Sequence, residues 1–201
     1  DLLKTADDGR MIQEGIKTVI LGKPNAGKSS LLNFLVGEDR AIVTEIEGTT
    51  RDILEEYISL NGITLRVIDT AGIRETEDIV EKIGVGKAKQ MAEDADLILY
   101  VVDSSRPLDD NDEDIIELLS GRKSIVIYNK TDLEPVVDME KIKQRTGSPV
   151  IPVSVVEETG IRKLEDEIKN MFFQGELSFN DEVYITCLLY TSPSPRDGLL
   201  S

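Results

Sequence analysis

Apolar residues follow two different spacings along this chain, and the spacing changes at a glycine-rich segment near the N-terminus. Lys17–Leu21 is a short run rich in β-branched residues, which predicts a buried strand ending at Gly22. From Lys28 to Val36 the apolar residues recur every three or four positions, which predicts a helix. A glycine-rich loop is therefore expected between a strand and a helix.

The next two apolar runs predict a β-hairpin. Ile53–Leu60 and Ile63–Asp69 are separated only by the dipeptide Asn61-Gly62. Asn-Gly between two apolar runs is a strong hairpin signal, because both residues accept the backbone conformation that tight turns require. Two antiparallel strands are expected here.

Further along the chain, strand-like runs alternate with helical patterns. Strands are predicted at Leu97–Val102, Ser124–Tyr128 and Val150–Val153, and helices near Asp110–Leu119, Met139–Thr146 and Ile161–Phe172. Alternation of this kind predicts a mostly parallel sheet with helices on both faces. The expected fold class is α/β, with a mostly parallel six-stranded sheet and one antiparallel strand at its edge.

Composition and charge restrict the functions that the chain can have. It has 201 residues, 40% of them hydrophobic and 31% charged, which is an ordinary globular balance with room for one substantial domain. The formal net charge of -16 argues against a broad nucleic-acid surface, because phosphate contacts need Lys and Arg. No apolar run approaches the roughly 20 residues that span a bilayer, so we expect a cytoplasmic protein with no membrane partner.

The ends of the chain differ from its centre. Residues 16–175 carry the alternating pattern and form the expected main domain, whereas residues 1–15 look like the end of a preceding helical segment. Residues 176–186 are interpreted as the return to a truncated helical domain. Residues 187–201, which include the single cysteine, share neither the acidity nor the periodicity of the rest and resemble translated library-adapter sequence. We expect this tail to be non-native and to carry no function.

The glycine-rich loop has the spacing G-x-x-x-x-G-K-[ST] of a phosphate-binding loop, or P-loop. Its two glycines allow successive backbone N–H groups to approach phosphate oxygens. Lys28 adds positive charge at the β- and γ-phosphates, and the hydroxyl of Ser29 is a ligand for Mg²⁺. The predicted nucleotide-binding residues of this segment are Asn25, Ala26, Gly27, Lys28, Ser29 and Ser30.

Two polar segments flank the predicted hairpin. Asp69-Thr70-Ala71-Gly72 follows its second strand, where Asp69 could hold a water on Mg²⁺ and Gly72 could donate its N–H to the γ-phosphate. Thr50 lies ahead of the hairpin, and its hydroxyl could join the Mg²⁺ shell only while the γ-phosphate is present. A contact that depends on the γ-phosphate in this way is how a switch segment senses hydrolysis.

Asn129-Lys130-Thr131-Asp132 ends another predicted strand in the arrangement N-K-x-D. The carboxylate of Asp132 can accept hydrogen bonds from N1–H and the exocyclic amine of guanine, a pair of donors that adenine lacks. Ser154 ends the next strand, where a further loop would touch the base. The usual pattern there is Ser-Ala-Lys, and Val156 stands in place of the lysine. The expected ligand is GTP, on a P-loop NTPase fold of the Ras-like G-domain type.

These motifs together resemble the G domain of the MnmE (TrmE) family of tRNA-modifying GTPases. The resemblance rests on GKPNAGKSSLLN, IVTEIEGTTRD, DTAGIRETED and VEKIGV, in that order, and covers the chain up to Thr186. GTPases of the Era and Der type, which act in ribosome assembly, share the first three motifs loosely and lack VEKIG.

The resemblance implies further site residues. Ile73 stands where many small GTPases have a glutamine, and in MnmE-like proteins a glutamate matching Glu81 acts on the attacking water through a second water. Asn25 would be one ligand of a bound K⁺, which replaces the arginine finger of other GTPases. The catalytic residues implied are Glu81, Lys28 and Gly72.

The resemblance also implies partners. The G domains of this family form a homodimer across their switch segments in the presence of K⁺. The complete protein works with the flavin-containing partner MnmG (GidA) on the wobble uridine of certain tRNAs. Two alternatives remain open: a ribosome-assembly GTPase of the Era or Der type, and a nucleotide-gated interaction module that hydrolyses GTP negligibly.

Overall fold

The computed structural model describes residues 11, 14–37, 55–60, 62–68 and 89–173. The elements, in chain order, are β1 (Ile16–Leu21), α2 (Lys28–Gly37), β2 (Glu55–Leu60), β3 (Ile63–Ile68), β4 (Leu97–Asp103), α5 (Asp110–Leu119), β5 (Ser124–Asn129), α6 (Met139–Thr146), β6 (Val150–Pro152) and α7 (Ile161–Phe173). Residues 89–94 are also helical.

The strands form one six-stranded sheet in the order β2-β3-β1-β4-β5-β6. All neighbouring pairs are parallel except β2 and β3, which pair antiparallel at one edge of the sheet. The tight turn of this hairpin includes Gly62, whose φ of 85° lies in the left-handed region that glycine adopts without steric cost. The predicted sheet, with its antiparallel edge strand, is confirmed.

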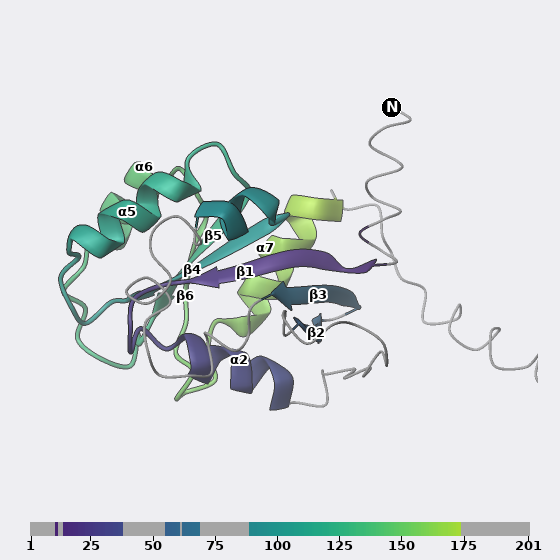
Figure 1. Ribbon diagram of the computed structural model, residues 1–201. Helices are drawn as coiled ribbons and strands as arrows, with labels where there is room; N and C mark the ends of the chain where they lie inside the picture. Colours follow the sequence, from purple (N-terminus) through teal and green to yellow (C-terminus); the bar gives the residue numbers. More distant parts are fainter. Residues whose placement is uncertain (1–10, 12–13, 38–54, 61, 69–88, 174–201) are drawn as a thin grey trace, which may run out of the picture.

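The sheet is buried on both faces because its side chains alternate between two apolar clusters. In β1, Ile16 and Ile20 belong to one cluster and Val19 and Leu21 to the other, as the two-residue period of a strand requires. The first cluster includes apolar residues of α2 and α7, and the second includes those of α5, α6 and residues 89–94. Figure 1 shows α5 and α6 on one side of the sheet and α2 on the other.

The helices on the second face begin at side-chain caps. Asp109 caps α5 by accepting hydrogen bonds from the backbone N–H groups of Asn111 and Asp112. Asp138 caps α6 in the same way, and α6 ends at Gly147, which has a φ of 65°. These local signals explain why both helices have the bounds that the apolar pattern predicts.

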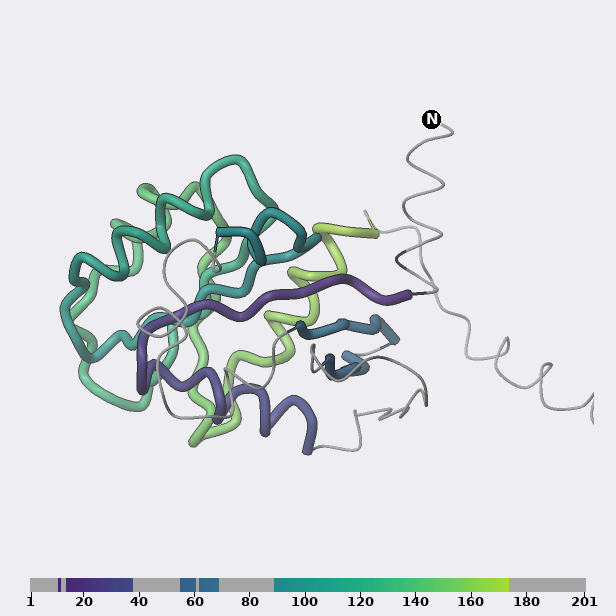
Figure 2. Tube along the Cα trace, viewed as in Figure 1, coloured from purple at the N-terminus to yellow at the C-terminus, as the bar shows by residue number. Residues whose placement is uncertain are grey.

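Parallel strands place the loops that follow them at the same end of the sheet, where the strands have their carboxyl ends. Here β1, β4, β5 and β6 all end on this side, so the loop after β1 lies near the loops after β5 and β6, as the chain trace in Figure 2 shows. No helix in the described ranges is long and apolar enough to cross a membrane.

Candidate nucleotide-binding site

The phosphate-binding loop connects β1 to α2 and has an unusual backbone. Gly22 has a φ of 152° and Gly27 a φ of 104°, and a Cβ at either position would overlap with neighbouring atoms. At Gly27 the neighbouring atom is the amide nitrogen of Asn129. Asn25 also has a positive φ, 60°, which asparagine tolerates better than most residues. The sequence therefore forms the compact loop that the motif predicts.

Lys28 begins helix α2 and folds back over this loop. Its Nζ donates hydrogen bonds to the carbonyl oxygens of Gly22 at 2.7 Å and Lys23 at 2.6 Å. The helix starts directly behind the loop, with the N–H of Leu31 donating to the carbonyl of Gly27 at 2.9 Å. Lys28 and the helix N-terminus thus add positive charge at the place where phosphate is expected.

Asn129 joins this loop to the loop after β5. Its Nδ2 donates a 2.8 Å hydrogen bond to the carbonyl oxygen of Ala26, and only 3% of the residue is exposed. Its Oδ1 is buried, and no hydrogen bond reaches it from the described residues. A buried amide oxygen without a partner is costly, so part of the hydrogen-bonding capacity of Asn129 is available for a ligand.

Lys130 follows Asn129 with a φ of 64° and forms an ion pair with Asp103. The Nζ–Oδ2 distance is 2.5 Å, and Asp103 also accepts hydrogen bonds from the backbone N–H and the hydroxyl of Ser105. Burial alone would raise the pKa of Asp103, but the bonds from Lys130 and Ser105 outweigh it, so the pKa is lowered. The carboxylate of Asp103 is thereby kept ionised beside the loop that follows β5.

Asp103 is a further residue of this site that the motifs do not predict, although the sequence carries a signal for it. It is the last residue of β4 and lies opposite Asn129, the last residue of β5. A carboxylate that ends a buried strand at the loop edge of a parallel sheet is a reasonable candidate for a site residue.

Asp132 and Ser154 come together from two different loops. The hydroxyl of Ser154 donates a 2.6 Å hydrogen bond to Oδ1 of Asp132, and Ser154 is fully buried whereas Asp132 is exposed. The backbone also links the two loops, because the N–H of Thr131 donates to the carbonyl of Val153 at 3.3 Å. The carboxylate is thus held at one oxygen in an exposed position, so it is a candidate acceptor for the two donors of guanine.

Val156 lies in the loop that follows Ser154. This loop is closed by a bridge between Ser154 and Thr159, and 84% of Val156 is exposed. Its side chain is therefore not part of the apolar core.

The predicted site residues divide into two groups. The structure brings together the phosphate loop, with Ser29 half-buried and Ser30 exposed in the first turn of α2, and the two loops that carry Asn129 and Ser154. Four predicted residues lie outside the described residues, namely Thr50, Asp69, Gly72 and Glu81. Among the described residues, no three His, Cys, Asp or Glu side chains gather in a way that would hold a metal ion.

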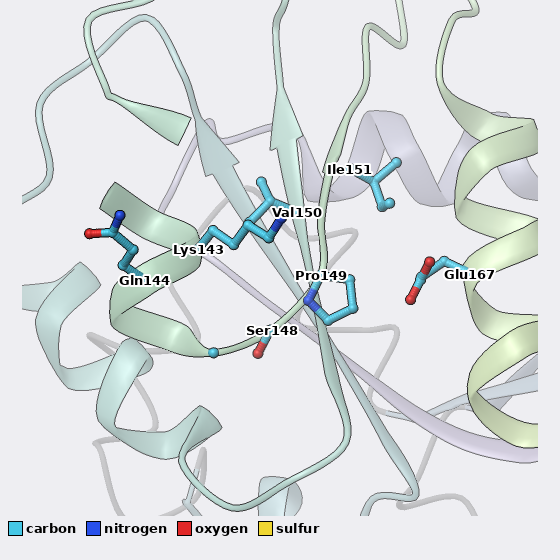
Figure 3. Close-up of a pocket in the computed structure, with 8 residues that line it drawn as sticks. Lys143, Gln144, Ser148, Pro149, Val150, Ile151 and Glu167 are labelled. Atoms are coloured by element: carbon cyan, nitrogen blue, oxygen red, sulfur yellow. The ribbon is translucent and has the colours of Figure 1, made fainter. Parts of the chain in front are cut away.

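A separate groove of about 710 Å³ lies at the opposite end of β6. Its lining includes Lys143, Gln144, Pro149, Val150 and Glu167, and Figure 3 shows side chains of α6 and α7 on either side of the start of the strand. Because β6 runs away from this groove toward Ser154, the groove is distinct from the phosphate-binding loop and from the loops after β5 and β6.

A family model described as 50S ribosome-binding GTPase matches residues 17–130, which include the phosphate loop and Asn129. The match covers more than half of the chain. The chain belongs to this GTPase family. The predicted G-domain fold and the predicted hydrolase class are thereby confirmed.

Curated relatives of this GTPase carry a more specific name. The chain is 58% identical to the tRNA modification GTPase MnmE of Lachnoclostridium phytofermentans and 50% identical to that of Bacillus subtilis, in both cases over 92% of the chain. It spans 41% and 40% of the length of these two relatives. The resemblance to MnmE that the motifs indicate is confirmed by these relatives.

Solved structures of related G domains have the same fold. The G domain of the T. maritima FeoB iron transporter has a TM-score of 0.55 and 29% identity, with 76% of this chain and 96% of that chain covered. A structure of Era bound to MgGDPNP and nucleotides of 16S ribosomal RNA has a TM-score of 0.57 and 28% identity, with 82% of this chain and 59% of that chain covered. Both likenesses support the G-domain fold described above.

Proposed function

We propose that this GTPase is the G domain of a protein that modifies the wobble uridine of tRNA, with hydrolysis stimulated by K⁺ and coupled to dimerisation of G domains. The observation that carries the proposal is the 50–58% identity to MnmE proteins over 92% of the chain. Residues 16–175 form the G domain in this proposal, and the tRNA substrate implies a cytoplasmic location.

The described residues account for GTP recognition. Lys28 and the N–H groups of the loop from Asn25 to Ser30 bind the phosphates, and the dipole of α2 favours their negative charge. Asp132, held by Ser154, accepts the two donors of guanine, and Asn129 fixes the distance between base and phosphates through Ala26. Adenine would leave the carboxylate of Asp132 without its two donors, which is a strong basis for selecting GTP.

Metal ions supply charge that the protein side chains do not. Ser29, Thr50 and Asp69 would hold Mg²⁺, and Asn25 would be one ligand of K⁺; these cations neutralise charge that develops between the β- and γ-phosphates. Asn25 is exposed on the phosphate-binding loop, and amide oxygens are suitable ligands for hard cations.

Hydrolysis also needs an oriented water. By the resemblance to MnmE, Glu81 orients the attacking water through a second water, and Gly72 donates its N–H to the γ-phosphate. Ile73 cannot take the role that glutamine has in many small GTPases, because its side chain has no hydrogen-bonding group.

The partners in this proposal follow from the whole protein that the chain resembles. They are a second G domain, the flavin-containing protein MnmG (GidA) and tRNA. The net charge of -16 supports an arrangement in which tRNA is bound mainly outside this domain.

A role in ribosome assembly is the second candidate function. It is favoured by the description of the matching family model and by the likeness to Era, whose structure contains ribosomal RNA. The identity to Era is 28%, against 50–58% for the MnmE relatives, so we place the tRNA-modification function first.

The experiment that tests the proposal is GTP turnover by the whole chain in KCl and in NaCl at equal ionic strength. We expect strong stimulation by K⁺ in the wild-type chain, loss of that stimulation in Asn25→Ala, and slow turnover in both salts in Glu81→Ala. Binding of GDP, measured in the same salts, should be retained in Glu81→Ala, because that residue acts on water and not on the nucleotide.

Equal and slow rates in the two salts would contradict K⁺ stimulation and would favour a nucleotide-gated interaction module. Fast turnover that is independent of K⁺, together with full activity of Glu81→Ala, would contradict the MnmE-type mechanism and favour a different branch of the family.

A further inference from the structure

A lysine of the phosphate loop is anchored to helix α5. The Nζ of Lys23 lies 2.6 Å from Oδ2 of Asp112 and 2.9 Å from Oδ2 of Asp109. Only 17% of the Lys23 side chain and 2% of the Asp112 side chain are exposed. An ion pair this well shielded is held more firmly than a typical surface pair, because solvent and salt screen it less.

The acceptor of this ion pair is fixed by two other elements. Oδ1 of Asp112 accepts a 2.7 Å hydrogen bond from the hydroxyl of Tyr100, a residue of β4 that is fully buried. Oδ2 of Asp112 accepts a 3.0 Å hydrogen bond from the backbone N–H of Asp109, which completes the capping box at the start of α5. The carboxylate therefore has little freedom to follow Lys23 if the loop moves.

The backbone of Lys23 meanwhile shapes the loop. Its carbonyl oxygen accepts the hydrogen bond from Nζ of Lys28 and a 3.3 Å hydrogen bond from the N–H of Ala26. Lys23 thus connects the carboxylates of α5, through its side chain, to the phosphate-binding groups, through its main chain.

We propose that Lys23 is a positioning residue, whose ion pair with Asp112 and Asp109 holds the phosphate loop in its nucleotide-binding shape. The loop includes positive φ angles at Gly22, Asn25 and Gly27, so it has many alternative conformations when it is not held. Holding it before the nucleotide arrives removes an ordering cost from binding. Lys23 acts in this way without touching the reacting phosphate.

The charge state of Lys23 is compatible with this role. Burial would lower the pKa of Lys23, but the hydrogen bonds to Asp112 and Asp109 outweigh it and raise the pKa. The lysine is therefore charged throughout the range in which GTP turnover is measured.

The test replaces Lys23 with methionine, which keeps much of the side-chain length and removes the charge. We expect Lys23→Met to raise the dissociation rate of a fluorescent GDP and the KM for GTP by about tenfold, which corresponds to about 1.4 kcal/mol. The kcat at saturating GTP should stay within about twofold of wild type, because the bound nucleotide restores the loop. Lys23→Arg should recover most of the lost affinity, since it can pair with the same carboxylates.

Arg145→Met is the matched control. Arg145, on α6, pairs with Glu113 of α5, and both side chains are more than 40% exposed. Like Lys23→Met, this variant removes a cation that pairs with a carboxylate of α5, and it should leave GDP dissociation and KM unchanged. Asp109→Asn, at an acceptor that is 55% exposed, should shift both values in the same direction as Lys23→Met but less.

The proposal is overturned if Lys23→Met binds GDP like the wild type, or if Lys23→Arg is as defective as Lys23→Met. It is also overturned if Arg145→Met raises the dissociation rate by the same factor, because the effect would then be a general loosening of α5. If Lys23→Met does not fold, Asp109→Asn becomes the test, and an unchanged GDP dissociation rate in that variant overturns the proposal.

Discussion

The side-chain amide of Asn129 donates a 2.8 Å hydrogen bond to the carbonyl oxygen of Ala26, across 103 residues of sequence. Asn129 ends β5 and Ala26 lies in the phosphate-binding loop, so a buried hydrogen bond links that loop directly to the loop after β5. In the proposed site a nucleotide spans both loops, so we expect its fit to depend on this contact.

Gly27 should not tolerate a side chain, because it lies directly against Asn129. An added Cβ would overlap with Nδ2 of Asn129, and the φ of 104° is unfavourable for alanine. We expect Gly27→Ala to reduce affinity for GDP by about a hundredfold or more, since backbone strain of about 1–3 kcal/mol adds to the displacement of Asn129. Equilibrium binding of a fluorescent GDP measures this.

Gly37→Ala provides the control for that substitution. An added Cβ at Gly37, the last residue of α2, meets no atom within 4 Å, so binding should be unchanged. Wild-type affinity in Gly27→Ala would show that the loop and Asn129 can separate without loss of the site.

Ser154 should matter for guanine recognition although it is buried and neutral. Its hydroxyl fixes Oδ1 of Asp132 at 2.6 Å, and its removal leaves the carboxylate free to turn away from the base. A hydrogen bond to a charged group contributes about 1.5–3 kcal/mol, so we expect Ser154→Ala to weaken GDP binding by about tenfold or more. Isothermal titration calorimetry with GDP would measure the change.

Ser124→Ala is the matched control for Ser154→Ala. The hydroxyl of Ser124 is also buried and pairs with that of Ser148 at 2.7 Å, but Ser124 begins β5, at the end of the strand opposite to Asn129. This variant should lower the free energy of unfolding and leave GDP affinity as it is. Equal losses of affinity in the two variants would contradict a specific role for Ser154.

The ion pair between Asp103 and Lys130 should stabilise the fold in a pH-dependent way. The folded-state pKa of Asp103 is lowered, against burial, by the bonds from Lys130 and Ser105. A carboxyl group of this kind stabilises the folded protein fully above its unfolded pKa of about 3.9, and the contribution is lost as pH falls through the lower folded-state pKa. We expect Asp103→Asn to reduce the free energy of unfolding by about 2 kcal/mol at pH 7, because hydrogen bonds to a charged group contribute about 1.5–3 kcal/mol.

Urea unfolding of the nucleotide-free chain, followed by circular dichroism at a series of pH values, checks this expectation. The difference between wild type and Asp103→Asn should be constant near neutral pH and shrink in the acid range. Glu113→Gln, at an exposed ion pair with Arg145, should show little difference at any pH. A difference between wild type and Asp103→Asn that grows toward acid pH would contradict the lowered pKa.

The elements of the fold were predictable from sequence because their signals are local. The predicted helices Asp110–Leu119 and Met139–Thr146 have those same bounds in the structure, since a capping aspartate precedes each. The hairpin also depends on neighbouring residues, and the alternation of strands and helices was enough to predict a parallel sheet.

Side-chain contacts between distant segments were not predictable in the same way. The pairing of Asp103 with Lys130 depends on the register between β4 and β5, and that of Lys23 with Asp112 depends on where α5 packs. Neither pair has a characteristic spacing in sequence. The contact of Asn129 with Ala26 likewise requires the order of the strands in the sheet. The motifs therefore indicated the loops of the site, and the fold supplies the contacts that hold them.

Val156, in the loop after β6, stands where the usual pattern has a lysine, and its exposure allows the effect of this difference on GDP binding to be tested. With 84% of the residue exposed, a longer side chain can be introduced without disturbing the core. A lysine stem could cover the base while its ammonium stays in solvent, and a cation near an aromatic ring contributes about 0.5–1 kcal/mol at exposed sites. We expect Val156→Lys to lower the GDP dissociation constant by about threefold. Val136→Lys, at another exposed valine, is the control: it makes the same change in net charge and should leave the GDP dissociation constant unchanged. Tighter GDP binding in both variants would indicate a general electrostatic attraction between the added charge and GDP. No gain in Val156→Lys would mean that this loop does not place residue 156 over the base.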